Sequence, residues 1–281
     1  MEYKIAAGIV CYNPDSERLI DNIKSIGSQV EIVYLFDNGS IDKSYLTKVE
    51  LIATNIIVLE SAINKGVAAA LNELCRVAIN SGYHWILTLD QDSVVEKNVI
   101  NNFVPYMNHE DIAIISPMVI DRNYGKMTSS SNKEFDYIQH AITSCSLLRL
   151  SAYSKVVGGF CDKMFIDSVD FDMCYSLSEL GFNIIRVNKA FLLHEIGHST
   201  KIKLFGRDEF AFNHSPLRCY YMVRNRILLY KRHHCYRFKD CITIIIKRFI
   251  IINKYENNKM LKNKMMLKGI IHGLIGHYGK Y

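Results

Sequence analysis

The chain has 281 residues, of which 49% are hydrophobic and 22% are charged, and this composition is ordinary for a soluble globular protein. Only 4 Pro and 15 Gly occur, and no low-complexity run is present, which excludes long disordered linkers. The formal net charge is +6, and Lys and Arg become denser from Arg218 onward. This asymmetry indicates either an acidic partner (nucleic acid, an anionic membrane surface or a phosphorylated substrate) or simply a solvated basic face.

The cysteines and the apolar stretches exclude several other classes of protein. The 8 Cys are scattered without a CxxC pair, so neither a zinc site nor a disulfide framework is indicated. The first residues are too weakly basic for a signal peptide, and residues 5–11 are better explained as a strand. The most apolar late stretch, 241–252, contains Lys247 and Arg248 and is too short to span a bilayer. We therefore expect a cytoplasmic protein with reduced thiols.

Apolar strands alternate with amphipathic helices in the first half of the chain. The expected strands cover residues 4–11, 31–36, 55–59, 85–89 and 112–116, and the expected helices cover 19–26 and 65–79. This alternation predicts an α/β fold with a mainly parallel sheet flanked by helices on both faces. After Pro117 the pattern predicts a polar loop (127–135), a strand (141–150), a helix (169–180), strands (184–187 and 190–193) and helices from 216 onward.

Polar clusters follow directly after three of the expected strands. They are Tyr12-Asn13, Asp37-Asn38-Gly39-Ser40 and Asp90-Gln91-Asp92. In parallel α/β sheets, ligands bind outside the carboxyl ends of the strands. We therefore expect these three loops to meet at one edge of the sheet and to form the functional site.

The sequence Asp90-Gln91-Asp92 places two carboxylates two residues apart at the end of a buried strand. Carboxylates in such a place are costly unless positive charge lies close to them. Mg²⁺ typically uses one or two carboxylates together with substrate phosphates, so this turn is a candidate site for Mg²⁺ or Mn²⁺ and a diphosphate. The alternative is that one Asp caps the helix that begins near Glu96.

Two further loops are candidates for nucleotide binding. Asp37 can accept hydrogen bonds from a base or a ribose, although Asn-Gly-Ser is also a common turn. Asn64-Lys65-Gly66 opens a helix, where a glycine permits close approach and the helix N-terminus suits phosphate. A plain helix start explains this second motif equally well.

The segment 165–172 carries three carboxylates, at positions 167, 170 and 172. If a helix begins near Ser168, this serine caps it, and the acidic residues after it favour the helix dipole. Alternatively, one carboxylate is a general base that deprotonates an acceptor hydroxyl.

His194 and His198 are four residues apart, a spacing that on a helix would resemble a zinc pair. Gly197 and the strand expected before His194 argue against a helix here, so only a metal-adjacent role is considered for His194.

A helical face is expected around residue 221. Tyr221, Arg224 and Asn225 lie at spacings i, i+3 and i+4, so they share this face. Arg can bind a phosphate with two hydrogen bonds, which makes Arg224 a candidate phosphate ligand. A solvated basic helix is the alternative.

Taken in order, these motifs resemble those of the family-2 inverting glycosyltransferases of the GT-A fold, over residues 4–225. The stretches FIDSVDFDMC, LLHEIGHS and RCYYMVRN are similar to those of bacterial rhamnosyltransferases that use dTDP-L-rhamnose. The family commonly has Glu-Asp where this chain has Val169-Asp170. The resemblance implies that Asp167 partly replaces the missing carboxylate.

The resemblance also implies a role for each matching residue. Asp170 would be the catalytic base, and Asp92 the ligand of Mg²⁺ or Mn²⁺, with His194 close to the metal. Asp90 would contact the ribose or support the metal, and Arg224 would bind a diphosphate or an acceptor phosphate. The other residues implied in nucleotide-sugar binding are Tyr12, Asp37, Asn38, Lys65 and Gln91, and those implied in acceptor binding or support are Asp167, Tyr221 and Asn225.

We expect a catalytic domain over residues 1–225 and a basic helical extension over residues 226–281. Residues 238–254 mix bulky apolar residues with Lys and Arg, as an interfacial helix does, although a helix packed on the core is equally consistent. The expected partners are a nucleotide-sugar donor, a lipid-linked saccharide of O-antigen or capsule synthesis and the inner face of the bacterial cytoplasmic membrane, and no nucleic acid. Alternatives are a UDP-galactose or UDP-N-acetylglucosamine donor, a sugar nucleotidyltransferase, or a non-catalytic polysaccharide- or membrane-binding module.

Overall fold

The computed structural model describes residues 3–52, 54–121, 125–126, 131–194 and 199–281. The chain forms two compact units. The N-terminal unit consists of Met1–Asp162 and Val169–Glu195, and the C-terminal unit consists of Lys163–Ser168 and Ile196–Tyr281. The short segment Lys163–Ser168 therefore belongs to the C-terminal unit although both of its neighbours in the chain belong to the other.

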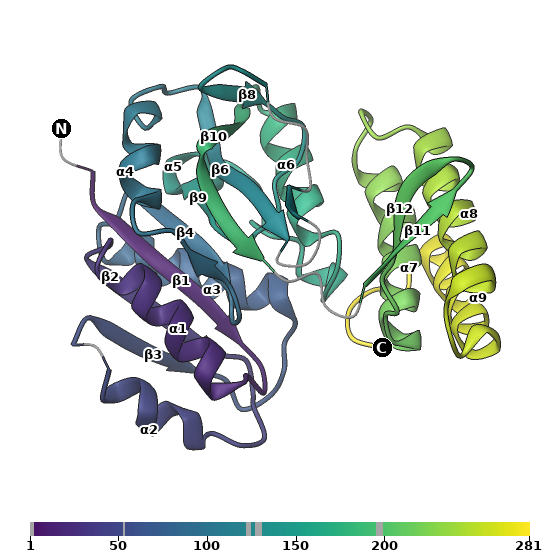
Figure 1. Ribbon diagram of the computed structural model, residues 1–281, viewed down its shortest axis with the longest axis horizontal. Helices are drawn as coiled ribbons and strands as arrows, with labels where there is room; N and C mark the ends of the chain where they lie inside the picture. The colour runs from purple at the N-terminus through teal and green to yellow at the C-terminus, as the bar shows by residue number, and fades with distance from the viewer. Residues whose placement is uncertain (1–2, 53, 122–124, 127–130, 195–198) are drawn as a thin grey trace. The chain divides into compact units, whose positions relative to one another are not determined.

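A mixed sheet forms the centre of the N-terminal unit (Figure 1). Its strands, in spatial order, are β3 (Ile56–Glu60), β2 (Ile32–Asp37), β1 (Ile5–Cys11), β4 (Trp85–Asp90), β9 (Ser146–Arg149), β6 (Ile112–Asp121), β10 (Asn183–His194) and β5 (Val94–Val95). The first four strands are mutually parallel, and β6 is parallel to β10. β9 lies antiparallel between the two groups, and β7 (Gly125–Lys126) and β8 (Phe135–Tyr137) pair at the side with β6 and β10. The expected α/β sheet with flanking helices is confirmed.

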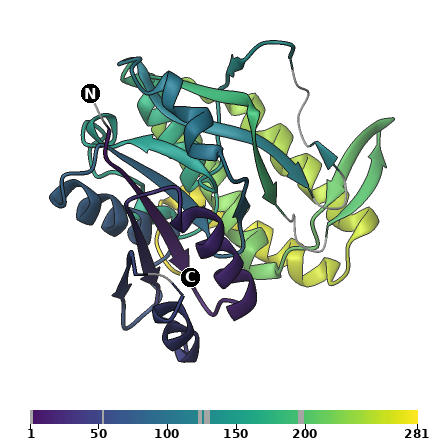
Figure 2. The same cartoon turned by 60° about the vertical axis from the view of Figure 1, so that its left-hand side comes forward.

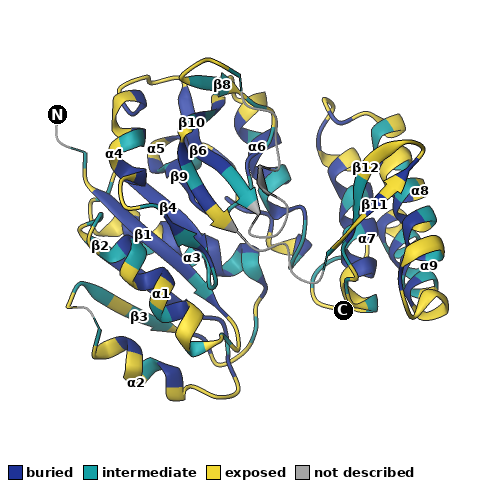
Figure 3. Ribbon diagram, viewed as in Figure 1, coloured by how far each residue is buried: buried dark blue, intermediate teal, exposed yellow. Residues whose placement is uncertain are grey.

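Helices cover both faces of this sheet (Figure 2). Alternate residues of β1 point to opposite sides: Ile5, Ala7, Ile9 and Cys11 join a buried cluster with α1 (Ser16–Gly27) and α4 (Val99–Phe103). On the other side, Gly8 faces Leu74 of α3 (Val67–Asn80), where an added Cβ would lie 3.2 Å from a Leu74 methyl carbon. β1 is apolar along its whole length because both of its faces are buried, as Figure 3 shows. The remaining helices among the described residues of the unit are α2 (Ser44–Glu50), α5 (Leu150–Tyr153) and α6 (Val169–Glu179), with a 3₁₀ turn at Val104–Tyr106. A second 3₁₀ turn, Asp162–Met164, lies where the chain passes from this unit to the C-terminal one.

Two expectations for the second half of the sheet need correction. The strands expected at 184–187 and 190–193 are one strand, β10, with a register shift between Val187 and Phe191. A bulge at this position interrupts the apolar pattern without ending the strand. The strand expected at 141–150 is shorter, since β9 covers only Ser146–Arg149. The polar loop expected at 127–135 falls partly outside the described residues.

The C-terminal unit combines a hairpin with three helices. β11 (Thr200–Leu204) and β12 (Arg207–Ala211) pair across a two-residue turn in which Phe205 and Gly206 both have positive φ angles. This is the turn geometry that matches the twist of a hairpin, but Phe is an unusual residue there, so the sequence pattern did not predict the hairpin. α7 (Pro216–Arg232), α8 (Phe238–Tyr255) and α9 (Lys259–Ile275) follow.

α7 and α9 approach closely at two glycines of α9. A Cβ added at Gly269 would lie 2.6 Å from the carbonyl oxygen of Tyr220, and one at Gly273 would lie 2.9 Å from Cβ of Ile227. Side chains at these two positions would force the helices apart. Because α7 runs without a break from Pro216 to Arg232, residue 225 is not a structural boundary, and the expected division at 225/226 differs from that of the compact units.

α8 has a buried face and an exposed apolar face. Its residues Ile245, Ile251 and Ile252 are buried within the unit, whereas Ile246 and Phe249 are exposed. Exposed apolar side chains also lie along α9, at Leu267, Ile271 and Leu274. Among the residues that the structure describes, no helix is both long enough and apolar enough to cross a membrane.

Candidate functional site

The carboxyl ends of four parallel strands lie side by side at one edge of the sheet. The registers pair Val10 with Asp90, Cys11 with Asp37, and Asp37 with Glu60. The loops after β1, β2 and β4 therefore start at the same level. The predicted convergence of the three polar clusters is confirmed, and it follows from the parallel direction of these strands.

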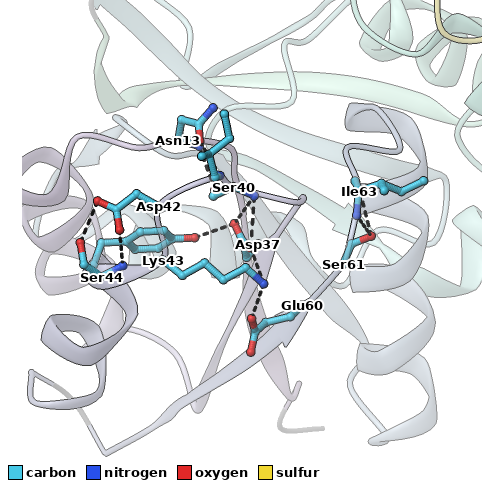
Figure 4. Close-up of polar contacts among 11 residues, drawn as sticks. Asn13, Asp37, Ser40, Asp42, Lys43, Ser44, Glu60, Ser61 and Ile63 are labelled. Carbon is cyan, nitrogen blue, oxygen red and sulfur yellow. Dashed lines mark hydrogen bonds and ion pairs between the residues drawn. The ribbon is translucent and has the colours of Figure 1, made fainter.

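Asp37 is buried beneath the loop that follows β2 (Figure 4). It accepts hydrogen bonds from the hydroxyl of Tyr45 at 2.8 Å and from the backbone N–H of Ser40 at 3.2 Å, and Lys43 Nζ lies 3.5 Å away. Burial alone would raise the pKa of Asp37, but the hydrogen bonds from Ser40 and Tyr45 and the charge of Lys43 outweigh it, so the pKa is lowered. The carboxylate is therefore ionised and shapes the loop from inside, and its predicted contact with a nucleotide stays a prediction.

Asn38 joins the loop after β2 to the loop after β3. Its Oδ1 accepts from the backbone N–H of Lys65 at 2.9 Å, and its Nδ2 donates to the carbonyl of Gly66 at 3.1 Å. Gly39 permits this contact, because its φ is +80° and an added Cβ would lie 2.4 Å from the carbonyl carbon of Ile63. The Lys65 side chain is exposed at the start of α3. Asn38 thus positions the loop that carries Lys65.

The Asp90–Asp92 turn is held from two sides. Gln91 Oε1 accepts a hydrogen bond from the backbone N–H of Tyr12 at 2.8 Å, which ties the loops after β1 and β4 together. Asn22, buried on α1, donates to the carbonyl of Asp90 at 2.6 Å. The side chains of Asp90 and Asp92 are both partly exposed. Neither Asp caps the helix near residue 96, since α4 begins at Val99 with Asn98 as its N-cap residue.

The donor atoms of this turn fit a hard divalent cation. Two carboxylates supply oxygen ligands, which Mg²⁺ and Mn²⁺ prefer, and both are accessible at the strand end. Within the described parts of the chain, no group of three His, Cys, Asp or Glu residues is placed to hold a metal. Such a group is not required where substrate phosphates complete the coordination.

The backbone of His194 lies at the same edge. β10 pairs antiparallel with β5, with Leu193 opposite Val94, so the next position, His194, continues toward Ser93 and the Asp92 turn. His194 also stands opposite Asp121 at the end of β6. This register is consistent with a metal-adjacent histidine. The side chain of His194 and residues 195–198, including His198, lie outside the described residues.

Asp170 lies in the first turn of α6, on the face of the sheet that α3 also covers. Its Oδ1 accepts a hydrogen bond from the backbone N–H of Phe171 at 2.9 Å. It lines a small cavity of about 20 Å³ together with Thr88, Met173 and Cys174. Most residues that line this cavity are apolar, and Asp170 contributes a carboxylate to it. Asp172, in contrast, is fully buried, which supports its structural interpretation.

Asp167 belongs to the C-terminal unit and pairs with Arg218, whose Nε lies 3.6 Å from its carboxylate. Ser168, the residue before α6, has a φ of +62°, whereas N-cap residues are typically extended. The serine cap expected here stays a prediction. The proposed support of Asp170 by Asp167 stays a prediction.

The predicted common face of Tyr221, Arg224 and Asn225 is confirmed, but it points into the C-terminal unit. All three side chains are buried, and Arg224 and Asn225 are fully so. Arg224 donates to the carbonyls of Lys163, Met164 and Gly279, at 3.1, 2.8 and 2.6 Å. The expected phosphate contact of Arg224 needs correction, because the side chain is fully buried and its terminal nitrogens donate to main-chain oxygens.

Sequence reasoning missed two supporting residues, Asn22 and Tyr45. Asn22 lies on the buried face of α1 among Leu19, Ile23 and Ile26, so a polar residue on an apolar helix face was the available signal. Tyr45 supports Asp37 from α2, eight residues further along the chain. Nothing in the sequence pattern indicated that contact.

The fold is that of a GT-A glycosyltransferase. The chain superposes on the crystal structure of GalNAc-T7 with UDP, GalNAc and Mn²⁺, with a TM-score of 0.64 and 12% identity, covering 98% of this chain and 58% of that one. It also superposes on a structure of S. aureus TarS (residues 1–349), with a TM-score of 0.56 and 13% identity, covering 98% and 72%.

Residues 7–165 match the model of Glycosyl transferase family 2, and the chain belongs to this family. It is 27% identical to the dTDP-rhamnosyl transferase RfbF of Shigella flexneri over 302 aligned positions, which cover 100% of this chain and 99% of that protein. It is also 29% identical to a hyaluronan synthase of Streptococcus pyogenes over 121 positions, covering 40% of this chain and 28% of that one. The family resemblance seen in the sequence motifs is confirmed.

Proposed function

We propose that this glycosyltransferase transfers L-rhamnose from dTDP-L-rhamnose, with inversion of configuration, to a lipid-linked saccharide in the synthesis of a surface polysaccharide such as O antigen or capsule. The observation that carries the donor assignment is the similarity to a dTDP-rhamnosyl transferase, because it extends over the whole of both chains. The proposal also draws on the convergence of three polar loops at the ends of β1, β2 and β4.

In this reaction Asp170 acts as the general base. Its carboxylate takes the proton from an acceptor hydroxyl while that oxygen attacks the anomeric carbon from the face opposite the diphosphate. The new C–O bond forms as the bond to the diphosphate breaks, and dTDP leaves with the electron pair.

The chain's own loops would hold the donor. Asn38 fixes the position of Lys65, and Gln91 fixes the position of Tyr12, so these groups are arranged before the donor arrives. Asp92, with Asp90 and His194 close to it, would hold a divalent cation of the Mg²⁺ or Mn²⁺ type. When bound, this cation neutralises charge on the departing diphosphate.

Release of the nucleoside diphosphate from a panel of donors tests the donor assignment. The purified enzyme is incubated with dTDP-L-rhamnose, UDP-galactose or UDP-N-acetylglucosamine, each with Mg²⁺ or Mn²⁺ and a lipid-linked acceptor. We expect dTDP-L-rhamnose to be used with the highest kcat/KM. Preference for a UDP-sugar would instead favour the second candidate donor class. No turnover of any donor with either metal would refute a transferase.

We also propose that the C-terminal unit binds the inner face of the cytoplasmic membrane, where a lipid-linked acceptor is found. Apolar side chains are exposed on α8 and α9, for example Phe249, Leu267 and Ile271, and lysines lie along the same helices. This combination is typical of interfacial helices that bind anionic lipids. We expect sedimentation with vesicles that contain phosphatidylglycerol, and loss of this binding in the double variant Phe249→Glu and Ile271→Glu. Equal recovery of both proteins with the vesicles would contradict it.

A further inference from the structure

The segment Lys163–Ser168 has an unusual backbone that needs support from outside. Phe165, Asp167 and Ser168 have φ angles of 64°, 73° and 62°, although none of them is glycine. Residues with side chains disfavour this region, so such a run persists only where surrounding contacts hold it. The segment leads directly into Val169, the first residue of α6, and then into Asp170.

The contacts come from the side chain of Asn225. Its Nδ2 lies 3.0, 2.8 and 2.7 Å from the carbonyl oxygens of Met164, Ile166 and Asp167. The orientation of this amide is defined, because Arg224 Nε, which can only donate, lies 3.0 Å from the Asn225 oxygen. The Asn225 side-chain nitrogen therefore contacts three backbone carbonyls of the segment, and the positive φ angles orient these carbonyls toward it.

Arg224 joins the same segment to the end of the chain. Its terminal nitrogens bond Lys163 and Met164 on one side and the carbonyl of Gly279 on the other. The guanidinium carbon lies 4.8 Å from the ring centre of Tyr221, which stabilises the buried charge. The fork of a guanidinium can reach these separate acceptors at once, and a lysine cannot.

The last residues of the chain complete this arrangement. Gly279 donates its N–H to the carbonyl of Lys163 at 2.8 Å, and the N–H of Tyr281 donates to the hydroxyl of Tyr221 at 2.7 Å. The Tyr221 ring in turn stacks on Phe165, with ring centres 5.4 Å apart. The chain terminus, α7 and Lys163–Ser168 thus form one set of contacts, which we call the 163–168 clamp.

We propose that Arg224, Asn225 and the C-terminal residues 279–281 are positioning residues for Asp170, which they hold indirectly by fixing the backbone that enters α6. This inference rests on the proposed function, since it takes Asp170 as the base. A small displacement of a general base lowers the rate of proton transfer without removing the donor site. The expected defect is therefore in kcat and not in donor binding.

The test compares Arg224→Lys and Asn225→Asp with the matched controls Arg237→Lys and Asn257→Asp, which change exposed residues of the same unit. We expect kcat for transfer to fall about 100-fold in the first pair while KM for the donor changes by less than about threefold. Both controls should behave as the wild type. Amide hydrogen exchange in the peptide covering 163–170 should be faster in the first pair only.

Deletion of residues 279–281 provides a variant that leaves Arg224 and Asn225 in place, should either substitution prevent folding. It should also lower kcat and speed exchange in the 163–170 peptide. Unchanged kcat in the folded variants, or unchanged exchange in this peptide, would overturn the clamp. An inactive wild type would instead overturn the proposed function alone, because the exchange measurement does not depend on turnover.

Discussion

Gln91 Oε1 accepts a hydrogen bond from the backbone N–H of Tyr12 at 2.8 Å. The bond joins two loops through residues that are 79 positions apart in the chain. Gln91 lies between Asp90 and Asp92 in the sequence, and its side-chain amide makes a contact that neither aspartate makes. It fixes the spacing between the loop after β1 and the loop after β4. The middle residue of this turn therefore has a structural role in the site, in addition to the roles assigned to the two aspartates.

Replacement of Gln91 by Leu removes this acceptor while keeping a side chain of similar size. The loss of one hydrogen bond, worth about 1 kcal/mol, should weaken dTDP binding about fivefold, because the Tyr12 loop is no longer held beside the turn. Isothermal titration with dTDP and Mg²⁺ measures this change. The exposed Gln139→Leu variant is the control, and equal affinities in the two variants would contradict the prediction.

Replacement of Asp170 by Asn removes the proposed base and preserves the shape of the side chain. We expect kcat for transfer to fall by about 10²- to 10⁴-fold, the usual contribution of general base catalysis, while dTDP binding is retained. The exposed Asp21→Asn variant serves as the control. Transfer within about threefold of the wild-type rate would exclude Asp170 as the base.

Chelation should abolish transfer, and Mg²⁺ or Mn²⁺ should restore it. Asp92→Asn should raise the metal concentration needed for half-maximal activity by at least about tenfold, and Asp90→Asn should raise it less. The physical reason is that Asp92 is assigned as the direct ligand and Asp90 as its support. The exposed Asp21 on α1 offers a matched Asp→Asn control. Full activity of the wild type in chelator would refute metal dependence.

The stability of the C-terminal unit should fall in acid because of His214. Burial, together with the charges of Arg218, Arg248 and Lys262, lowers the pKa of His214 from 6.5 to about 3. Between pH 6.5 and about pH 3, His214 is protonated in the unfolded chain but stays neutral in the folded chain. The free energy of unfolding therefore decreases as pH falls through this range. Chemical denaturation from pH 7 to pH 4 should show a smaller loss in His214→Asn than in the wild type. The exposed His234→Asn variant should follow the wild type.

Much of the sheet was predictable because its signals are local. The strand over Ile5–Cys11 and the helix over Ser16–Gly27 follow from apolar periodicity, and the parallel order of strands follows from their alternation with helices. The hairpin at 200–211 was not predictable, since Phe205 adopts a backbone conformation that its residue type disfavours. The continuity of β10 was also hidden, because a bulge breaks the periodicity that identifies a strand.

The motifs identified the kind of site more reliably than the task of each residue. Asp90 and Asp92 lie at a strand end and are accessible, as their spacing after an apolar run predicted. Arg224 looked equally suited to a phosphate, because helical spacing cannot distinguish an exposed face from a buried one without knowing what packs against it. The structure gives its donors to main-chain carbonyls of Lys163, Met164 and Gly279.

The sequence by itself determined the α/β fold, the edge of the sheet where the polar loops meet and the family to which the chain belongs. These properties depend on local patterns and on the order of motifs along the chain. Only the tertiary structure decided that Asp37 is buried, that Gln91 holds Tyr12, and that Arg224 and Asn225 hold the backbone before Asp170. Those contacts join residues far apart in the chain, and a linear pattern carries no information about which distant groups a side chain meets when its face is covered.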